Sequence, residues 1–395
     1  MTASAIRHPG ELRWETRLLA VVTATLVVFG IASTYGALSL ATNRAGDSTG
    51  FAYALRQATG AVMGGILLLI AARLDYQLWR KFAWPMLLGT IVFLLIPVLP
   101  GTDRIAPSIN GARRWVDLGP VNFQPSELAR LVIVIWCAML AAKKGAQIRE
   151  FKKGLFPFLV VVGFVSLLVF LEPNLSMAIL LAFLAGVVLF TAGARIGHFL
   201  LLGMAAVPLL FYSIQNWQYR LARVLTFLNP GQASDAASFQ INQSLIGFGS
   251  GQLLGVGFGQ GQQKQGYLPY NYSDFLFSSI GEEWGFVGVC AIVLLFGLFV
   301  WLGYRIARTA PDPFGQYLAV GITTGIGFTA FLHMAVTMGM MPTTGLTLPF
   351  MSYGRSSLMM SLLGTGILLS IGRQRGRPAR AEAQGRSGAG RGERK

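Results

Sequence analysis

One carboxylate stands at the end of the most unusual stretch of this chain. Residues 239–285 are rich in Gly and Gln and lie between long apolar runs, and Asp274 comes just before the chain becomes apolar again. Irregular backbone beside a membrane persists only where protein buries it or water reaches it. The stretch therefore suggests a polar site, ending in the carboxylate of Asp274, that apolar helices hold. The alternative, which position alone favours, is that Asp274 caps the helix that follows.

Further charged residues belong to the same stretch. Glu282 and Glu283 lie about two turns into the next predicted helix. Acids inside an apolar span are costly unless they are paired or face a polar cavity, so at least one of them should face the protein interior. Lys264 supplies a cation among glycines, whose close backbone approach suits a polar ligand. As a phosphate-loop signal the pattern is weak, because no strand precedes it and no Gly-Lys-Ser/Thr follows.

Several arginines lie in loops that we predict to be external. Arg220 and Arg223 are three residues apart, so a helix places them on one face. A guanidinium group makes paired, charge-assisted bonds to phosphate, which makes these residues and Arg114 candidates for binding a diphosphate. Structural roles are also open. Arg114 could pair with Asp117 or Glu127, and a basic helix could rest among lipid headgroups.

Two acids lie at the ends of predicted spans. Glu127 follows Pro125-Ser126 at the start of a span, where the positive end of the helix favours an acid. Glu172 joins two spans. An acid in that place is usually functional or paired, and for Glu172 we favour structural pairing with an outer arginine.

A last outer segment, residues 341–357, contains two prolines and two glycines that interrupt the helical pattern. Its hydroxyl groups, among them those of Ser352 and Tyr353, could line the same cavity as Asp274, together with Arg355. A purely structural re-entrant turn explains the segment equally well.

The composition indicates the elements that must hold these residues. Of 395 residues, 53% are hydrophobic and 12% are charged, which excludes a soluble domain and predicts an all-α polytopic membrane protein. We expect about ten transmembrane helices, near residues 17–40, 56–73, 82–99, 126–143, 155–172, 175–193, 197–214, 276–304, 316–340 and 351–371. The two cysteines lie in apolar runs, and the three scattered histidines form no metal-binding pattern.

Charge predicts the orientation. The net charge of +16 is mostly Lys and Arg in one set of short connections and in the tail, which places both termini in the cytoplasm rather than indicating a nucleic-acid partner. A large extracytoplasmic loop then lies between spans seven and eight. We expect a cytoplasmic arm at 1–16, a transmembrane domain at 17–372 and a basic, disordered tail at 373–395.

Together these segments resemble the SEDS family (shape, elongation, division and sporulation) of peptidoglycan glycosyltransferases, with the division branch (FtsW-like) slightly favoured over the RodA-like branch. The matching motifs follow the family's order over about residues 15–372. They are Gly111–Trp115, Gln124–Glu127, Tyr219-Arg220 through Asn229-Pro230, Gln243-Ser244, the glycine run, Leu268-Pro269, Ser273–Phe275, Gly281–Glu283 and Pro342–Ser357.

The resemblance implies an enzyme of the bacterial cytoplasmic (inner) membrane that polymerises lipid II on its outer face, with Asp274 as the essential acid. Its partners would be lipid II, undecaprenyl-diphosphate-linked glycan, a class B penicillin-binding protein and other division or elongation proteins. Candidate residues for the diphosphate or the sugar are Arg114, Glu127, Arg220, Arg223, Lys264, Glu283, Ser352 and Tyr353. The cofactor stays open: a divalent cation, Mg or Mn, could share this role, but its ligands are unknown.

The chain departs from the family pattern at several positions: Arg130, Asn174, Gln252, Thr329, His333 and Arg355 replace Lys, Asp, a small residue, Gln, Asn and Gly, respectively. Two other functions remain alternatives. One is a flippase for lipid-linked oligosaccharides, and the other is a non-enzymatic scaffold for a cell-wall synthase.

Overall fold

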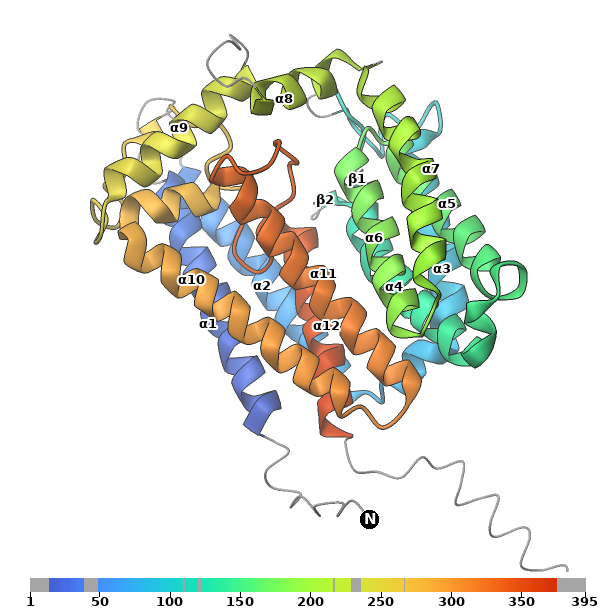
Figure 1. Cartoon of the computed structure of the whole chain (residues 1–395). Helices are drawn as coiled ribbons and strands as arrows, with labels where there is room; N and C mark the ends of the chain where they lie inside the picture. The colour runs from blue at the N-terminus through green and yellow to red at the C-terminus, as the bar shows by residue number, and fades with distance from the viewer. Residues whose placement is uncertain are drawn as a thin grey trace, which may run out of the picture.

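The computed structural model describes residues 14–38, 49–108, 111–119, 122–215, 217–228, 236–265 and 267–374. Most of the predicted disordered tail and most of the predicted N-terminal arm lie outside these ranges, whereas Arg373, the first tail residue, ends α12. Apolar helices dominate this part of the chain (Figure 1). They are α1 (Trp14–Leu38), α2 (Thr49–Arg73), α3 (Gln77–Val98), α4 (Pro125–Lys144), α5 (Phe156–Leu171), α6 (Leu175–Thr191), α7 (Ile196–Gln215), α10 (Leu276–Arg308), α11 (Pro313–Thr337) and α12 (Arg355–Arg373).

The prediction of an all-α polytopic membrane protein with about ten spans is confirmed. Within the described residues, nine helices are long and apolar enough to cross a membrane, and α6 is a shorter apolar helix of 17 residues. Helices α12 and α4 are the most enclosed in protein: α12 packs mainly against α2, and α4 packs against α3, α6 and α11. The only strands in the described chain are β1 (Val116–Asp117) and β2 (Asn122–Phe123), a short antiparallel pair that pairs Val116 with Phe123.

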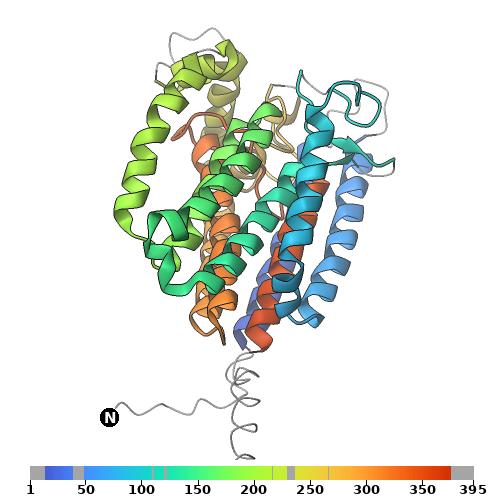
Figure 2. The same cartoon turned by 90° about the vertical axis from the view of Figure 1, so that its right-hand side faces the viewer.

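The bundle has two different ends. Helix α1 begins and α12 ends at one of them, which we call the terminal end, and the β1–β2 pair lies at the other, the loop end (Figures 1 and 2). At the terminal end the Arg305 guanidinium lies 2.7 Å from Glu15 and contacts the rings of Trp14 and Trp301 at 5.1 and 4.9 Å. These contacts fasten the start of α1 to the last turns of α10.

The predicted large loop between spans seven and eight contains two helices of its own. Helices α8 (Gln218–Leu228) and α9 (Ala236–Gly251) cross the loop end from α7 to α10 (Figure 1). The basic helix considered at Arg220 and Arg223 lies in α8. The expectation of irregular backbone from residue 239 onward is wrong for its first part, because residues 239–251 belong to α9. Each glycine costs about 1 kcal/mol relative to alanine in a helix interior, and packing of α9 against α10 outweighs that cost here.

Helix α10 is broken near its start. Gly285 has φ 62° and ψ −161°, which no helix allows, and the chain after α9 supplies hydrogen bonds at the break. Phe286 N donates to Gln252 O at 2.9 Å, and Val256 N donates to Glu282 O at 3.0 Å. A Cβ at Gly255 or Gly285 would overlap the facing backbone, so these glycines serve chain-to-chain packing. Gln252, where the family has a small residue, also has positive φ, at 46°.

We expect Gly285→Ala to lower stability by about 1–3 kcal/mol or more, because the substitution adds left-handed strain to a steric overlap with Leu253. Thermal unfolding of the purified protein in detergent checks this. The matched control is Gly163→Ala in α5, where the added methyl group meets open space. Equal melting temperatures for the two variants would show that the break does not depend on glycine.

Candidate functional site

Asp274 lies at the loop end, immediately before α10, and its side chain does not cap that helix. The N-cap residue is Phe275, and no side chain makes a capping bond there. The backbone N–H groups of Ser273 and Asp274 both donate to Tyr270 O at 3.0 Å, which closes a tight turn. The capping interpretation of Asp274 is therefore wrong, and the carboxylate is available for another role.

The surroundings of Asp274 are partly apolar and partly cationic. Its side chain is half-buried, and burial raises the pKa of the carboxyl group, while Arg223, a hydrogen bond from Ser273 and Arg114 act in the opposite direction. Arg223, on α8, also donates to Thr343 O at 2.9 Å. The structure thus brings Asp274 together with two of the four cations that the sequence suggested for a diphosphate. A carboxyl group of raised pKa facing fixed positive charge suits general-base chemistry.

Arg114 is held by backbone carbonyl groups. Its Nε donates to Glu172 O at 3.2 Å and its terminal nitrogen to Pro173 O at 2.5 Å, so both of these bonds go to main-chain oxygens rather than to the predicted Asp117 or Glu127. The predicted pairing of the Glu172 carboxyl group with an outer arginine is found only in part, because Arg114 bonds to the main-chain oxygen of Glu172 and not to its carboxyl group. The Glu172 carboxyl group is buried without a hydrogen bond to any described residue, and burial raises its pKa to about 9 against the opposing effect of Arg114.

The segment between α11 and α12 lies directly against Asp274. A Cβ added at Gly345 would lie 3.8 Å from Asp274 Oδ2. The Ser352 hydroxyl donates to Ser273 O at 2.6 Å and accepts from Leu348 N at 3.0 Å, so it ties this segment to the residue before Asp274. Ser352 is thus used internally, whereas Tyr353 stays half-buried.

Gln57 on α2 is a supporting residue that the sequence analysis missed. Its fully buried amide donates to Ser352 O at 2.9 Å and accepts from Gly354 N at 3.2 Å. The amide therefore holds the backbone on both sides of Tyr353. The available signal was a polar Arg56-Gln57 pair in an otherwise apolar span, but its partners are almost 300 residues away in sequence.

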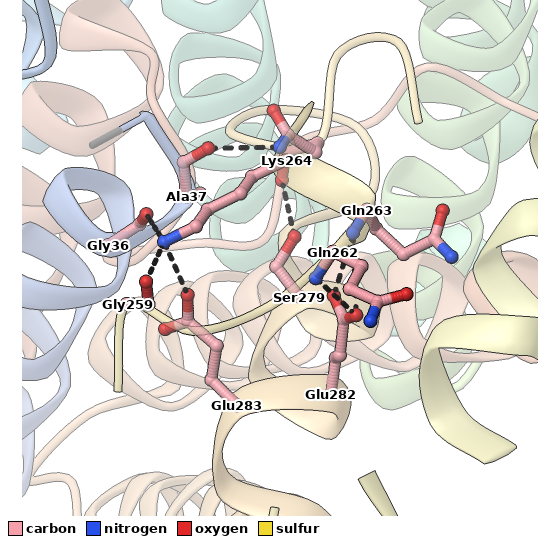
Figure 3. A network of polar contacts seen from close by, with 10 residues as sticks. Gly36, Ala37, Gly259, Gln262, Gln263, Lys264, Ser279, Glu282 and Glu283 are labelled. Atoms are coloured by element: carbon pink, nitrogen blue, oxygen red, sulfur yellow. Dashed lines mark hydrogen bonds and ion pairs between the residues drawn. The ribbon is translucent and has the colours of Figure 1, made fainter. Parts of the chain in front are cut away.

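Lys264, Glu282 and Glu283 form a buried polar network (Figure 3). The Lys264 ammonium group lies 3.9 Å from Glu283 Oε1 and donates to the carbonyl oxygens of Gly36 and Gly259. Burial lowers the pKa of Lys264, and Glu283 and Glu282 oppose that shift. Glu282 accepts from Gln262 N at 2.7 Å.

Both acids face the protein interior, as predicted for at least one of them. The geometry gives Lys264 and Glu283 supporting roles, in which they join the loop after α9 to α1 and α10. Direct contact of either residue with a ligand stays an untested expectation.

Glu127 also has an internal partner. Its carboxylate lies 3.1 Å from Arg130, one turn later on α4. Arg130 reaches Ser361 Oγ at 3.3 Å and Thr329 Oγ1 at 3.5 Å. Two of the departures from the family pattern therefore contact each other. Arg130 is longer than the usual Lys, and Thr329 is shorter than the usual Gln.

The other departures have local explanations. Asn174 is the N-cap of α6 and accepts from Met177 N at 3.3 Å, which Asn does as well as Asp. His333 Nδ1 lies 2.8 Å from Leu346 O. Gly60 on α2 leaves room for the Arg355 side chain, since a Cβ there would lie 3.0 Å from its Cγ.

Two sequence predictions cannot be placed in full. Arg220 belongs to α8, but its side chain, like Asn229 and Pro230, lies outside the described residues. In the part of the chain that is described, no three His, Cys, Asp or Glu side chains are grouped to hold a metal ion.

The comparisons with known proteins all indicate the same family. Residues 16–377 match the FtsW/RodA/SpoVE family, described as cell cycle proteins. The chain is 39% identical over 362 residues to the probable peptidoglycan glycosyltransferase FtsW of Geobacter sulfurreducens, covering 91% of this chain and 96% of that protein. It is 36% identical over 358 residues to stage V sporulation protein E of Bacillus subtilis, covering 90% and 96%.

Solved structures show the same fold. A chain of a peptidoglycan synthase complex superimposes with a TM-score of 0.72 at 27% identity, covering 91% of this chain and 98% of that one. The rod shape determining protein RodA of Thermus thermophilus superimposes with a TM-score of 0.66 at 28% identity, covering 91% and 97%. The chain therefore belongs to the FtsW/RodA/SpoVE family of multi-pass membrane proteins and is FtsW-like.

Proposed function

We propose that this protein is a peptidoglycan glycosyltransferase that polymerises lipid II into glycan strands, and that Asp274 is its general base. The observation that carries the proposal is a half-buried carboxylate, not used as a helix cap, that faces Arg223 and Arg114 at one end of a membrane bundle. The names of the relatives above support the same activity. Residues 17–372 would form the catalytic unit.

The reaction assigns a role to each part of the site. Asp274 accepts the proton of the acceptor sugar hydroxyl, whose oxygen bonds to the donor's anomeric carbon, and the anomeric C–O bond breaks with its electron pair leaving on the undecaprenyl diphosphate. Arg223 and Arg114, with Arg220 on the same helix as Arg223, supply positive charge near the departing diphosphate. Both prenyl tails stay in the bilayer beside the bundle.

The distribution of charge favours a transferase over a flippase. Apart from Glu15, every buried charged side chain among the described residues lies in the connections of the loop end or in the first turns of α4 and α10. A cavity between α4, α6, α11 and α12 is lined by apolar residues and glycines except for Arg130 and Ser361. A flippase is expected to carry charged groups through the depth of the bundle, and the buried charged side chains of the described residues do not extend that far.

Purified protein tests the proposal directly. Labelled lipid II is incubated with the protein and its class B penicillin-binding protein, whose transpeptidase serine is blocked, and glycan strands are resolved on a gel. We expect strands longer than the substrate. Transfer of label between vesicle leaflets without any polymer would indicate a flippase, and the absence of both would favour a scaffold. Repeating the assay without the partner, and with Mg²⁺ or Mn²⁺ removed, tests the need for each.

The orientation is a further prediction. With the loop end outside the bacterial cytoplasmic membrane and both termini inside, a cysteine at Leu118 should react with an impermeant thiol reagent in intact cells, and one at Ala146 should not. Both positions are exposed, and the test uses a chain whose Cys137 and Cys290 are replaced by Ala. Labelling at position 146 alone would reverse the orientation.

A further inference from the structure

Three tyrosines from distant parts of the chain meet beside Asp274. Tyr53 comes from α2, Tyr272 precedes Asp274 by two residues, and Tyr353 lies just before α12. The ring centroids are 5.4 Å apart for Tyr53–Tyr272, 5.1 Å for Tyr53–Tyr353 and 5.7 Å for Tyr272–Tyr353, with steep angles between the ring planes. We call this group the tyrosine cluster.

The cluster is fixed in place by the main chain. Tyr353 N donates to Tyr272 O at 3.0 Å, so two of the three residues are joined directly. The buried Gln57 amide holds the backbone on both sides of Tyr353 and stands on the same helix as Tyr53. A ligand that met these rings would therefore find them already arranged, which lowers the entropic cost of binding.

The cluster also keeps polar groups available. All three side chains are half-buried, and none of the three hydroxyl groups makes a hydrogen bond to a described residue. Burial raises the pKa of Tyr272 to about 12, with smaller effects of the same sign from Tyr53 and Asp274 among others. At neutral pH its hydroxyl is therefore a hydrogen-bond donor. The Arg56 guanidinium lies 5.8 Å from the centre of the Tyr53 ring and adds a cation at the edge of the cluster.

We propose that the tyrosine cluster is a sugar subsite, which binds a pyranose ring of a lipid-linked saccharide and presents a hydroxyl group of it to Asp274. A pyranose has apolar C–H faces and a polar rim, and a tyrosine pairs an apolar ring with one polar group, so the two surfaces are complementary. Small-molecule sites commonly combine aromatic walls with a few polar groups in this way. The inference rests on the proposed function, because it assigns the acceptor sugar to this subsite.

Ligand binding without turnover separates the subsite from the chemistry. All variants are made in an Asp274→Asn background, and the affinities for lipid II and for undecaprenyl diphosphate, which lacks the sugars, are measured in nanodiscs. The double variant Tyr272→Phe/Tyr353→Phe keeps the rings and removes two hydroxyl groups. We expect it to weaken lipid II binding about tenfold, as the loss of one to two hydrogen bonds implies, and to leave undecaprenyl diphosphate binding unchanged.

A single variant, Tyr53→Leu, removes one ring of the cluster. It should also weaken lipid II binding and leave undecaprenyl diphosphate binding unchanged. The control is Tyr267→Phe, an exposed tyrosine of the same loop that is not part of the cluster. Equal weakening of both ligands would show that the cluster only supports the loops, and unchanged lipid II binding would show that no sugar meets it; either result overturns the inference.

The binding experiment and the polymerisation assay can fail separately. If the parental protein makes no polymer while its preference for lipid II over undecaprenyl diphosphate still depends on the tyrosines, the sugar subsite stands and the proposed transferase fails. If the parent polymerises lipid II and the tyrosines do not affect its binding, only the subsite fails.

Discussion

Replacing Asp274 with Asn should abolish lipid II polymerisation while the protein still folds and still binds lipid II and its partner. The amide is nearly the same size as the carboxylate but cannot accept the proton of the acceptor hydroxyl. A positioned general base contributes about 10²- to 10⁴-fold to rate, so we expect at least a 100-fold loss. The measurement is the rate of strand formation by purified protein with the blocked partner.

The stability of the same variant shows whether the loss is chemical. Because the N-cap of α10 is Phe275 and no side chain caps it, Asp274→Asn should leave the melting temperature unchanged. The matched control is Asp117→Asn at the end of β1. Asp117 accepts a hydrogen bond from Gly119 N at 2.8 Å, which an amide oxygen also does, and full activity is expected. A parental rate in Asp274→Asn would remove Asp274 as the base and turn attention to Glu172, the other acid beside Arg114.

The spans were predictable because they depend on local composition. Apolar runs of about 20 residues mark membrane helices, and all ten predicted ranges coincide with observed helices to within a few residues at most of their ends. α2 is an exception, since it begins at Thr49, seven residues earlier than predicted. That extra length carries Tyr53, which explains why one of the three rings of the tyrosine cluster went unnoticed.

The internal contacts of the site were not predictable in the same way. Gln57 bonds to residues 352–354, and Lys264 bonds to Gly36, and neither pairing leaves a local pattern in the sequence. The role predicted for the glycines was wrong for a related reason. These glycines do allow close backbone approach, as the sequence predicted. The backbone that they approach is that of α10 and not a bound ligand, and sequence composition does not distinguish the two cases.

For the charged residues, the sequence predicted which ones matter but not what each of them contacts. Sequence position marked Arg114, Arg223, Lys264, Glu127 and Glu283 equally as candidates for the substrate. The structure separates them, because Lys264 and Glu283 are a buried pair, Glu127 is paired with Arg130, and the two arginines face Asp274. A buried charge needs a partner of opposite charge or a polar group wherever it lies. A charged residue in an apolar sequence therefore predicts that such a partner exists, but not whether the partner belongs to the protein or to a ligand.

Substitutions at Arg114 should separate its charge from its geometry. Its guanidinium holds two neighbouring carbonyl groups, those of Glu172 and Pro173, while its charge lowers the pKa of Asp274. Arg114→Lys keeps the charge but cannot make both bonds. A misplacement of about 1 Å costs on the order of 10²-fold in rate, so we expect a loss of about 10- to 100-fold with the pH profile of polymerisation unmoved.

Arg114→Gln should lose at least as much activity and should also move the pH profile. The base acts as the ionised carboxylate, so the rate falls as pH falls through the pKa of Asp274. Burial already raises that pKa, and removing a cation that lowers it raises it further, which shifts the acidic limb of the profile to higher pH. Arg113→Lys is the control from the same motif, because the partner of Arg113 among the described residues is Asp103, in a surface ion pair worth about 0–1 kcal/mol. A fully active Lys variant would reduce Arg114 to a generic charge. An unmoved profile in the Gln variant would show instead that Arg114 does not act on Asp274, and that its work is confined to holding the connection between α5 and α6.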